Sequence, residues 1–180
     1  MITSKTSFIA LIGNPISHSL SPIMQNAALK YLGLDLIYIA IPCKDEDLKI
    51  ILNSLKKINC KGLNITIPFK QKVFDLCSEI SPIASQLKAI NTLKLNSERE
   101  WSATNTDVDG FIYPLKNLNL TNKQSIVLGS GGAARAVIQG LIKLNFSTIS
   151  VVSRNKTSLD SLIKNFENQI KIQGLVNNDD

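Results

Sequence analysis

The chain has few of the residues that build disulfide frameworks or metal sites. It contains three cysteines and one histidine among 180 residues. Cys43, Cys60 and Cys77 are widely spaced and form no Cys-x-x-Cys motif, so neither a disulfide framework nor a zinc site is indicated. We interpret them as buried, reduced thiols. His18 completes no ligand cluster, so no metal is expected, and it is better read as a loop-packing residue than as a base.

Long apolar runs and long basic runs are also absent. No apolar run reaches membrane-spanning length and no export signal opens the chain, so neither bilayer insertion nor secretion is indicated. The net charge is +6, but the lysines are scattered among acids and no basic run with aromatics appears. Nucleic-acid binding is therefore not expected. We expect a cytoplasmic monomer or homodimer that binds a small molecule.

What the chain has is a regular alternation of strands and helices in a sequence that is 44% hydrophobic. Strands are predicted at 7–12, 36–41 and 62–68. Between them we expect a helix that Ser21 caps, Pro22 opens and Gly33 ends, and a second helix over 45–59 with acids in its first turn. The alternation predicts parallel βαβ units and a doubly wound α/β architecture.

The second half of the sequence continues this pattern. We predict a helix over 71–80, another from Ser81-Pro82, strands at 89–95 and 101–106, and a short helix around 107–115. A new βαβ unit then begins, with strands at 125–128 and 148–153, helices at 133–144 and 158–166, and a further strand from 170. We place a domain boundary near Gly110, giving domains 1–109 and 110–180. A dinucleotide-binding fold needs two mononucleotide halves, so the chain looks like the front part of a longer protein.

The segment from Asn64 to Lys70, Asn-Ile-Thr-Ile-Pro-Phe-Lys, combines packing with polar chemistry. Period-2 alternation sends Leu63, Ile65, Ile67 and Phe69 to one face, and Asn64, Thr66 and Lys70 to the other. Because Pro68 cannot donate to a sheet, the strand should end near it, with Lys70 just past the tip beside Thr66. Such an amine is a candidate acid or base, although an exposed lysine that opens the next helix is the plainer alternative.

A glycine-rich loop follows the first strand of the later βαβ unit. Its sequence, Gly129-Ser-Gly131-Gly132-Ala-Ala134, matches the G-x-G-x-x-G/A pattern between a strand and a helix. Glycines let backbone N–H groups approach a diphosphate at the helix N-terminus. The loop residues expected to bind a cofactor are Gly129, Ser130, Gly131, Gly132 and Ala133.

The end of the next strand favours NADP over NAD. Where NAD-binding proteins place an acid for the ribose hydroxyls, this chain has Ser153-Arg154-Asn155-Lys156. Arg154 can bind a 2′-phosphate with two hydrogen bonds, and Lys156 adds charge. A basic turn in solvent is the alternative reading.

Four motifs in this order resemble shikimate dehydrogenase, and the resemblance covers nearly the whole chain as the N-terminal two thirds of such an enzyme. They are Gly13-Asn-Pro-Ile-Ser-His-Ser19-Leu-Ser21-Pro, the segment 64–70, Ala89-Ile-Asn91-Thr, and Asn105-Thr-Asp107. The resemblance implies an α/β substrate domain followed by a Rossmann domain that is here partial. It also implies NADPH-dependent, reversible reduction of 3-dehydroshikimate to shikimate in aromatic amino-acid biosynthesis.

The resemblance also assigns roles to residues. Ser19 and Ser21 would hold the substrate carboxylate, Thr66 and Asn91 would contact the substrate, and Lys70 would be the catalytic lysine with Asp107 as its partner. Asp107 could in addition cap the helix that follows it. The chain departs from the family pattern at Ala103, Ser153, Asn155 and Ser158. Of these, Ser158 stands where the family often has a basic residue, so binding of the 2′-phosphate would depend on Arg154 and Lys156.

Three other functions stay open. A quinate/shikimate dehydrogenase would accept a broader substrate or NAD, and Ser19, Ser21 and Arg154 lean against it. A methylenetetrahydrofolate dehydrogenase shares the general plan and a lysine, but the His18-Ser-Leu-Ser-Pro22 loop does not suit it. A non-catalytic fragment that binds nucleotide or shikimate is the alternative outside the enzymes, and the presence of both Lys70 and Asp107 argues against it.

Overall fold

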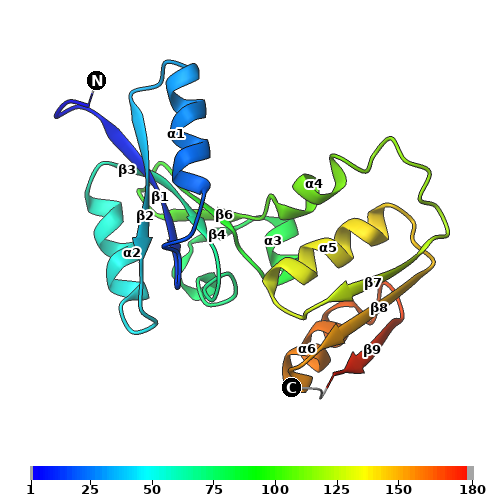
Figure 1. The fold of residues 1–180 in the computed structure, drawn as a ribbon. Coiled ribbons are helices and arrows are strands. Elements are labelled where there is room, and N and C mark those ends of the chain that lie inside the picture. Colours follow the sequence, from blue (N-terminus) through cyan, green and yellow to red (C-terminus); the bar gives the residue numbers. More distant parts are fainter. Residues whose placement is uncertain (1, 178–180) are drawn as a thin grey trace. The chain divides into compact units, whose positions relative to one another are not determined.

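The structure, a computed structural model, describes residues 2–177 and divides into two units. Unit 1 comprises the chain up to Ser85 together with Ile90–Asn105, and unit 2 comprises Gln86–Ala89 and the chain from Thr106 onward. Each unit has its own sheet with helices beside it (Figure 1), which confirms the predicted α/β class. No helix among the described residues is long and apolar enough to cross a bilayer.

Unit 1 is built on a six-stranded mixed sheet with the order β2-β1-β3-β5-β6-β4. Strands β1, β2 and β3 are parallel, as predicted, whereas β5 runs antiparallel to both of its neighbours. The start of β5 therefore lies at the same sheet edge as the ends of β1 and β3. The strands are β1 (Ser7–Gly13), β2 (Leu36–Pro42), β3 (Cys60–Ile65), β4 (Glu79–Ile80), β5 (Thr92–Leu95) and β6 (Trp101–Thr104).

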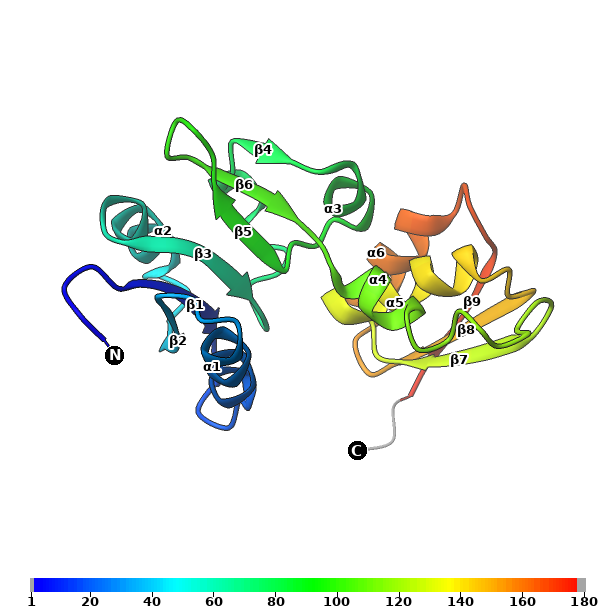
Figure 2. The same ribbon diagram turned by 90° about the horizontal axis from the view of Figure 1, so that it is seen from above.

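Helices α1 (Ser21–Tyr31) and α2 (Leu48–Lys57) cover opposite faces of this sheet (Figure 2). The period-2 alternation of β1 explains this, because Leu11 faces the cluster with Leu29 of α1, and Ile12 faces the larger cluster with Leu52 of α2. The larger cluster also contains Trp101, whose indole N–H donates to the Leu52 carbonyl at 3.1 Å.

The outer edge of β2 is closed at one point by a side chain of α1. The Asn26 carboxamide accepts from the Tyr38 backbone N–H and donates to the Tyr38 carbonyl, both at 2.8 Å. It also donates to the Pro22 carbonyl at 2.8 Å. Asn26 thus takes the place of a neighbouring strand and fixes α1 against the sheet.

The helix ends of unit 1 differ from the sequence prediction in two places. Leu20 holds the N-cap position of α1 and Ser21 is already the first helical residue, so Ser21 is not the cap. Helix α2 begins at Leu48, so the acids at 45–47 precede its first turn instead of lying within it. The predicted end of α1 is confirmed, because Gly33 follows it with a φ of 64°.

The predicted helix over 71–80 is wrong. A 3₁₀ turn at η1 (Phe74–Leu76) is followed by β4, which pairs with β6. The backbone N–H of Ser78 donates to the Trp101 carbonyl at 3.0 Å, so sheet pairing overrides local helix propensity here. The following short helix, α3 (Pro82–Leu87), begins at the predicted Ser-Pro pair.

Two further expectations need correction. Strand β3 ends at Ile65, and Ile67 is 62% exposed, so the alternation does not continue to Ile67, although Phe69 is buried as expected. His18 is exposed and does not pack within its loop.

Unit 2 has a three-stranded parallel sheet, β7-β8-β9, with helices packed beside it. Its core includes Ile138, Ile149, Leu162 and Phe166, all with essentially no exposure. This is the predicted βαβ pattern, a partial Rossmann arrangement. The elements are α4 (Asp107–Ile112), β7 (Gln124–Leu128), α5 (Gly132–Lys143), β8 (Thr148–Ser153), α6 (Lys156–Phe166) and β9 (Ile172–Val176).

A substitution at the end of β1 tests how tightly the chain packs there. A Cβ on Gly13 would overlap the methyl groups of Thr66 and Ile16 and stand 3.0 Å from the Ile67 carbonyl oxygen. Gly13→Ala should therefore lower the free energy of unfolding by about 1–3 kcal/mol, the usual cost of overpacking. Gly110→Ala is the control, because a Cβ there meets nothing within 4 Å. Urea denaturation measures both variants, and an unchanged stability of Gly13→Ala would contradict this packing.

Candidate functional site

Polar residues of unit 1 gather where β1 and β3 end and β5 begins. The backbone N–H of Thr66 donates to the Ile12 carbonyl at 2.9 Å, and the backbone N–H of Ile65 donates to the Asn91 carbonyl at 2.8 Å. Thr66 and Asn91, both expected to contact substrate, therefore flank the same strand end. Ligands of open α/β sheets bind at this carboxyl edge.

Lys70 is held at the same edge by its own backbone. Its carbonyl accepts from the N–H of Ile90 at 2.7 Å, directly before Asn91. The Phe69 side chain beside it is buried in the core, which anchors the turn after β3. The structure thus brings Thr66, Lys70 and Asn91 together through the backbone.

The serine loop, which is the motif from Gly13 to Pro22 that contains Ser19 and Ser21, also starts at this edge of the sheet. The backbone N–H of Asn14 donates to the Ile67 carbonyl at 2.9 Å, which joins the loop after β1 to the turn that carries Lys70. Farther along the loop, the Ser19 hydroxyl accepts from the Ser21 backbone N–H at 3.2 Å. The Ser19 hydroxyl therefore pairs with the backbone N–H of Ser21, the first helical residue of α1, while Leu20 between them holds the N-cap position.

A series of hydrogen bonds connects Tyr38 through Asn64 to Asn91 and Thr92. The Tyr38 hydroxyl donates to Asn64 Oδ1 at 2.8 Å, and Asn64 Nδ2 lies 3.4 Å from both the Asn91 carbonyl and Thr92 Oγ1. The Thr92 hydroxyl donates to Asn91 Oδ1 at 2.8 Å. The Asn91 carboxamide oxygen is thus turned toward Thr92, which fixes the orientation of this side chain.

Burial keeps this network in one protonation state. It raises the pKa of Tyr38 to about 12, so the phenol stays protonated and remains a donor at neutral pH.

Burial likewise raises the pKa values of the Cys43 and Cys60 thiols, and that of Cys77 to about 11. All three cysteines are free thiols, with Cys43 and Cys60 buried as expected and Cys77 half-buried.

Asp107 belongs to unit 2, where it is the first residue of α4 and half-buried. Thr106 holds the N-cap position, so the expectation that Asp107 caps the helix is wrong. A carboxylate in the first turn still interacts favourably with the helix N-terminus. Its partnership with Lys70 of unit 1 stays a prediction.

The glycine loop has the backbone geometry expected for a phosphate site. Gly129 has a φ of 105°, a conformation that favours glycine, and Gly131 is the N-cap of the twelve-residue helix α5. A Cβ at either position would meet nothing within 4 Å, so the space beside the loop is open. A pocket of about 330 Å³ joins this loop to the end of β8, lined by Leu128, Gly129, Val152, Ser153, Arg154 and Asn177.

Arg154 and Lys156 are exposed beside this pocket and at the start of α6. Between them Asn155 caps α6, its Oδ1 accepting from the Ser158 backbone N–H at 2.8 Å. Ser130 and Ser153 are in contrast 6% and 7% exposed, and their hydroxyls lie 2.7 Å apart. The sequence placed both serines at the cofactor, and the structure shows that their hydroxyls also bond to each other.

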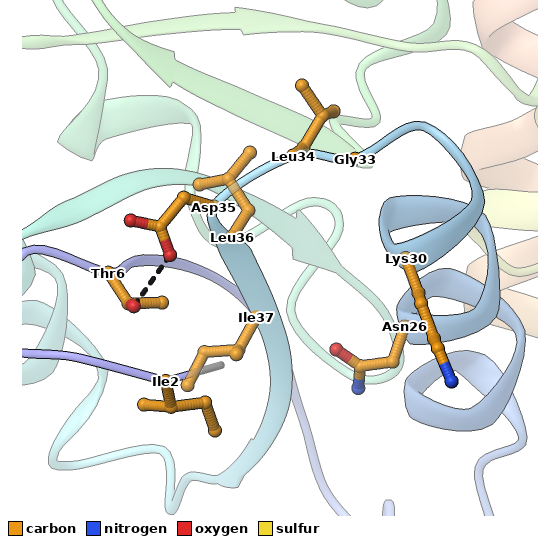
Figure 3. A pocket seen from close by; sticks show the side chains of 9 residues that line it. All are labelled: Ile2, Thr6, Asn26, Lys30, Gly33, Leu34, Asp35, Leu36 and Ile37. Atoms are coloured by element: carbon orange, nitrogen blue, oxygen red, sulfur yellow. Dashed lines mark hydrogen bonds between the residues drawn. The ribbon is translucent and has the colours of Figure 1, made fainter.

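The pocket in Figure 3 lies elsewhere, beside α1 and β2, and has a volume of about 470 Å³. None of the site residues expected from the sequence lines it. Three of its polar side chains are bonded within unit 1, since the Thr6 hydroxyl donates to Asp35 Oδ1 at 2.6 Å and Asn26 is bound to the backbone of Tyr38. We therefore do not assign the candidate site to it. Its lining residues are Ile2, Thr6, Asn26, Lys30, Gly33, Leu34, Asp35, Leu36 and Ile37.

A metal centre has no support in the described part of the chain, residues 2–177. No group of three or more His, Cys, Asp or Glu side chains there is arranged to hold an ion. What the fold and the polar residues define is an α/β protein with a substrate-binding domain followed by a partial Rossmann-like region.

The comparisons with known proteins specify the family within this class. Residues 11–93 match the family described as the shikimate dehydrogenase substrate binding domain. Over 179 residues the chain is 87% identical to shikimate dehydrogenase (NADP(+)) of Prochlorococcus marinus strain MIT 9312, an alignment that covers 99% of this chain and 63% of that protein. The chain is thus similar to shikimate dehydrogenases over nearly its whole length, and the resemblance inferred from its motifs is confirmed.

Solved structures agree with this similarity. The crystal structure of shikimate dehydrogenase from Aquifex aeolicus superposes with a TM-score of 0.88 at 34% identity, covering 97% of this chain and 64% of that one. A shikimate dehydrogenase crystallised in complex with NADP+ gives a TM-score of 0.86 at 35% identity, covering 97% and 63%. The chain therefore spans less than two thirds of the length of these relatives.

Tyr38 and Thr92 are the parts of the site that sequence reasoning missed. Tyr38 reads as one more apolar member of its strand, and only the pairing of β2 with β1 and of β1 with β3 brings it to Asn64. The position of Asn64 between the apolar residues Leu63 and Ile65 was the available signal, because a half-buried carboxamide needs partners.

The hydroxyl of Tyr38 gives a pH-dependent prediction. Because the folded protein holds this proton up to about pH 12 whereas an unfolded tyrosine releases it near 10, its contribution to stability is complete below pH 10. It is lost as the pH rises from 10 to 12. Tyr38→Phe should lower the free energy of unfolding by about 1–3 kcal/mol at pH 7, because Asn64 Oδ1 loses its donor.

The variant should also lose stability less steeply than the wild type between pH 10 and 12. Denaturation curves across this range measure both effects, and Tyr31→Phe serves as the control because Tyr31 is 91% exposed. Equal slopes for Tyr38→Phe and the wild type would contradict the proposed role of the hydroxyl.

Proposed function

We propose that the full-length product of this gene is an NADP-dependent shikimate dehydrogenase. The observation that carries the proposal is the set of backbone hydrogen bonds that brings Thr66, Lys70 and Asn91 to one sheet edge. The similarity to shikimate dehydrogenases supports it, although the chain spans only 63% of the length of the relative with 87% identity. In this proposal residues 1–109 form the substrate domain and residues 110–180 begin the NADP domain.

The substrate is held by polar groups of unit 1. Hydroxyls of Ser19 and Ser21 bind its carboxylate at the start of α1, where the helix N-terminus favours negative charge. Thr66 binds a ring hydroxyl and Asn91 contacts the substrate. The hydrogen bonds from Thr92 and Asn64 hold Asn91 in place before substrate arrives, so less entropy is lost on binding.

The chain's own acid–base group is Lys70. During reduction the ketone oxygen of the substrate gains a proton, and in the reverse direction the hydroxyl loses one. Lys70 gives and takes this proton, and Asp107 orients the amine. Work of this kind typically contributes about 10²–10⁴-fold to the rate.

The cofactor fits unit 2. The open space beside Gly129 and Gly131 leaves room for a diphosphate at the N-terminus of α5, and Arg154 with Lys156 can bind a 2′-phosphate beside the adjoining pocket. When bound, NADPH supplies the hydride. The contribution of these residues is therefore to bind the cofactor by its phosphates and to favour the phosphorylated ribose over the plain one.

Replacing the lysine tests the chemistry. In the full-length gene product, Lys70→Ala should lower kcat by about 10²–10⁴-fold while the NADP dissociation constant is unchanged, because the amine acts on the substrate alone. Lys72→Ala is the matched control, since this nearby lysine only forms a surface ion pair with Asp45. If Lys70→Ala raised KM and left kcat as it was, Lys70 would bind substrate without transferring a proton.

Asp107→Asn separates charge from shape at the second catalytic position. The carboxamide fills the same volume but cannot carry the negative charge that orients an ammonium group. We expect a fall in kcat similar to that of Lys70→Ala, with thermal stability kept within about 1 kcal/mol, the scale of a first-turn helix charge. A loss of folding with unchanged kcat in the folded fraction would instead assign Asp107 to the helix.

Replacing the arginine tests the cofactor. Arg154→Ala should weaken NADP binding by about 1.5–3 kcal/mol, the scale of hydrogen bonds to a charged group, and should change NAD binding little. Lys164→Ala is the control, because it removes the same charge from the last turn of α6. Calorimetric titration measures both cofactors, and equal losses for NADP and NAD would contradict a 2′-phosphate site.

Three features of the proposal rest on the sequence alone. Preference for shikimate over quinate, a cytoplasmic location, and a monomeric or homodimeric state remain predictions. Parallel assays with shikimate and quinate would decide the first of them.

A further inference from the structure

The glycine loop and the basic turn belong to different strand–helix connections, yet a buried cluster of serine side chains joins them. We define the serine cluster as Ser130, Ser153 and Ser158. Ser130 Oγ lies 2.7 Å from Ser153 Oγ, and the Ser158 hydroxyl donates to the Ser130 carbonyl at 3.1 Å. Ser130 comes from the glycine loop, Ser153 ends β8, and Ser158 lies in the first turn of α6.

Two members of the serine cluster are also bonded to Asn155, in the turn that carries Arg154. Ser153 Oγ accepts from the Asn155 backbone N–H at 3.2 Å, and the Ser158 N–H donates to Asn155 Oδ1 at 2.8 Å. A continuous set of hydrogen bonds therefore connects Ser130 of the glycine loop with the basic turn. Ser130 and Ser153 are nearly inaccessible to water, which strengthens their hydrogen bond and makes its loss costly.

We propose that the serine cluster fixes the spacing between the glycine loop and the basic turn, and thereby determines how well this chain binds a nucleotide with phosphates at both the 5′ and the 2′ positions of its ribose. The inference rests on the proposed NADP function and deepens it. Ser130 and Ser153 act here as positioning residues, because their hydroxyls are engaged with each other and set the place of the groups that bind phosphate.

The spacing matters for ligands that touch both segments. When one ligand binds two segments, its second contact is favourable only if the segments already stand at the right separation. If the serine cluster already holds the two segments at this separation, a ligand that binds both does not have to order them, and its binding costs less free energy. A ligand with one phosphate contacts one segment and gains nothing from the spacing.

The test uses the full-length gene product and three probes: adenosine 2′,5′-bisphosphate, adenosine 2′-phosphate and adenosine 5′-phosphate. Calorimetric titrations compare the wild type with Ser130→Ala, Ser153→Ala and the double variant. We expect the bisphosphate to bind roughly 3- to 10-fold more weakly to each variant, the effect of one hydrogen bond, with both monophosphates unchanged. The double variant should be no weaker than Ser153→Ala, because Ser130→Ala removes only the bond that Ser153→Ala has already broken, whereas Ser153→Ala also removes the acceptor of the Asn155 N–H.

The double variant also separates positioning from folding. Ser153→Ala leaves the buried Ser130 hydroxyl without its serine partner and lowers the melting temperature, whereas the double variant removes that hydroxyl as well and regains part of the stability. A double variant that is stable and still weak for the bisphosphate supports the proposal. Ser153→Thr, which keeps a hydroxyl, should restore bisphosphate affinity.

Two results would overturn the inference, and they differ in what else they contradict. If the wild type binds the bisphosphate and the double variant binds it equally well, or loses all three probes in proportion, the serine cluster does not set the spacing, and the NADP site stands. If the wild type binds the bisphosphate no better than the monophosphates, the NADP site itself is contradicted together with this inference.

Discussion

The candidate substrate site depends on hydrogen bonds that connect the end of β3 and the turn after it to the end of β1 and to the chain just before β5. The N–H of Thr66 reaches the Ile12 carbonyl, the N–H of Ile65 reaches the Asn91 carbonyl, and the N–H of Ile90 reaches the Lys70 carbonyl. These bonds are possible because β5 runs antiparallel and begins at the edge where the parallel strands end. The turn after β3, which carries Thr66 and Lys70, and the chain just before β5, which carries Asn91, are thereby held at one end of the sheet.

Side-chain hydrogen bonds refine what the backbone has placed. In unit 1 the series from Tyr38 through Asn64 and Thr92 orients the Asn91 carboxamide. In unit 2 the serine cluster joins the glycine loop to the turn with Arg154. In our proposal the hydroxyls of both sets hold a neighbouring group in place, which is how preorganised sites are built.

The sequence predicted most strands and helices, the carboxyl-edge location of Thr66 and the glycine loop, because these depend on local periodicity and on short motifs. It failed where tertiary pairing decides the outcome. Residues 71–80 have a helical pattern, yet Glu79 and Ile80 pair with β6 and prevent a helix. The alternation of apolar and polar residues in the sequence extends to Ile67, but β3 ends at Ile65 and Ile67 is exposed. The partners of Tyr38 and Ser153 lie more than twenty positions away, so no local pattern could name them.

The most direct test of the proposed function is the turnover of the full-length gene product with shikimate and NADP, followed by nicotinamide absorbance. We predict NADPH formation that depends on shikimate and that falls sharply when NAD replaces NADP. Folded, full-length protein that binds NADP but forms no NADPH from shikimate would contradict the assignment of Thr66, Lys70 and Asn91 to a shikimate site.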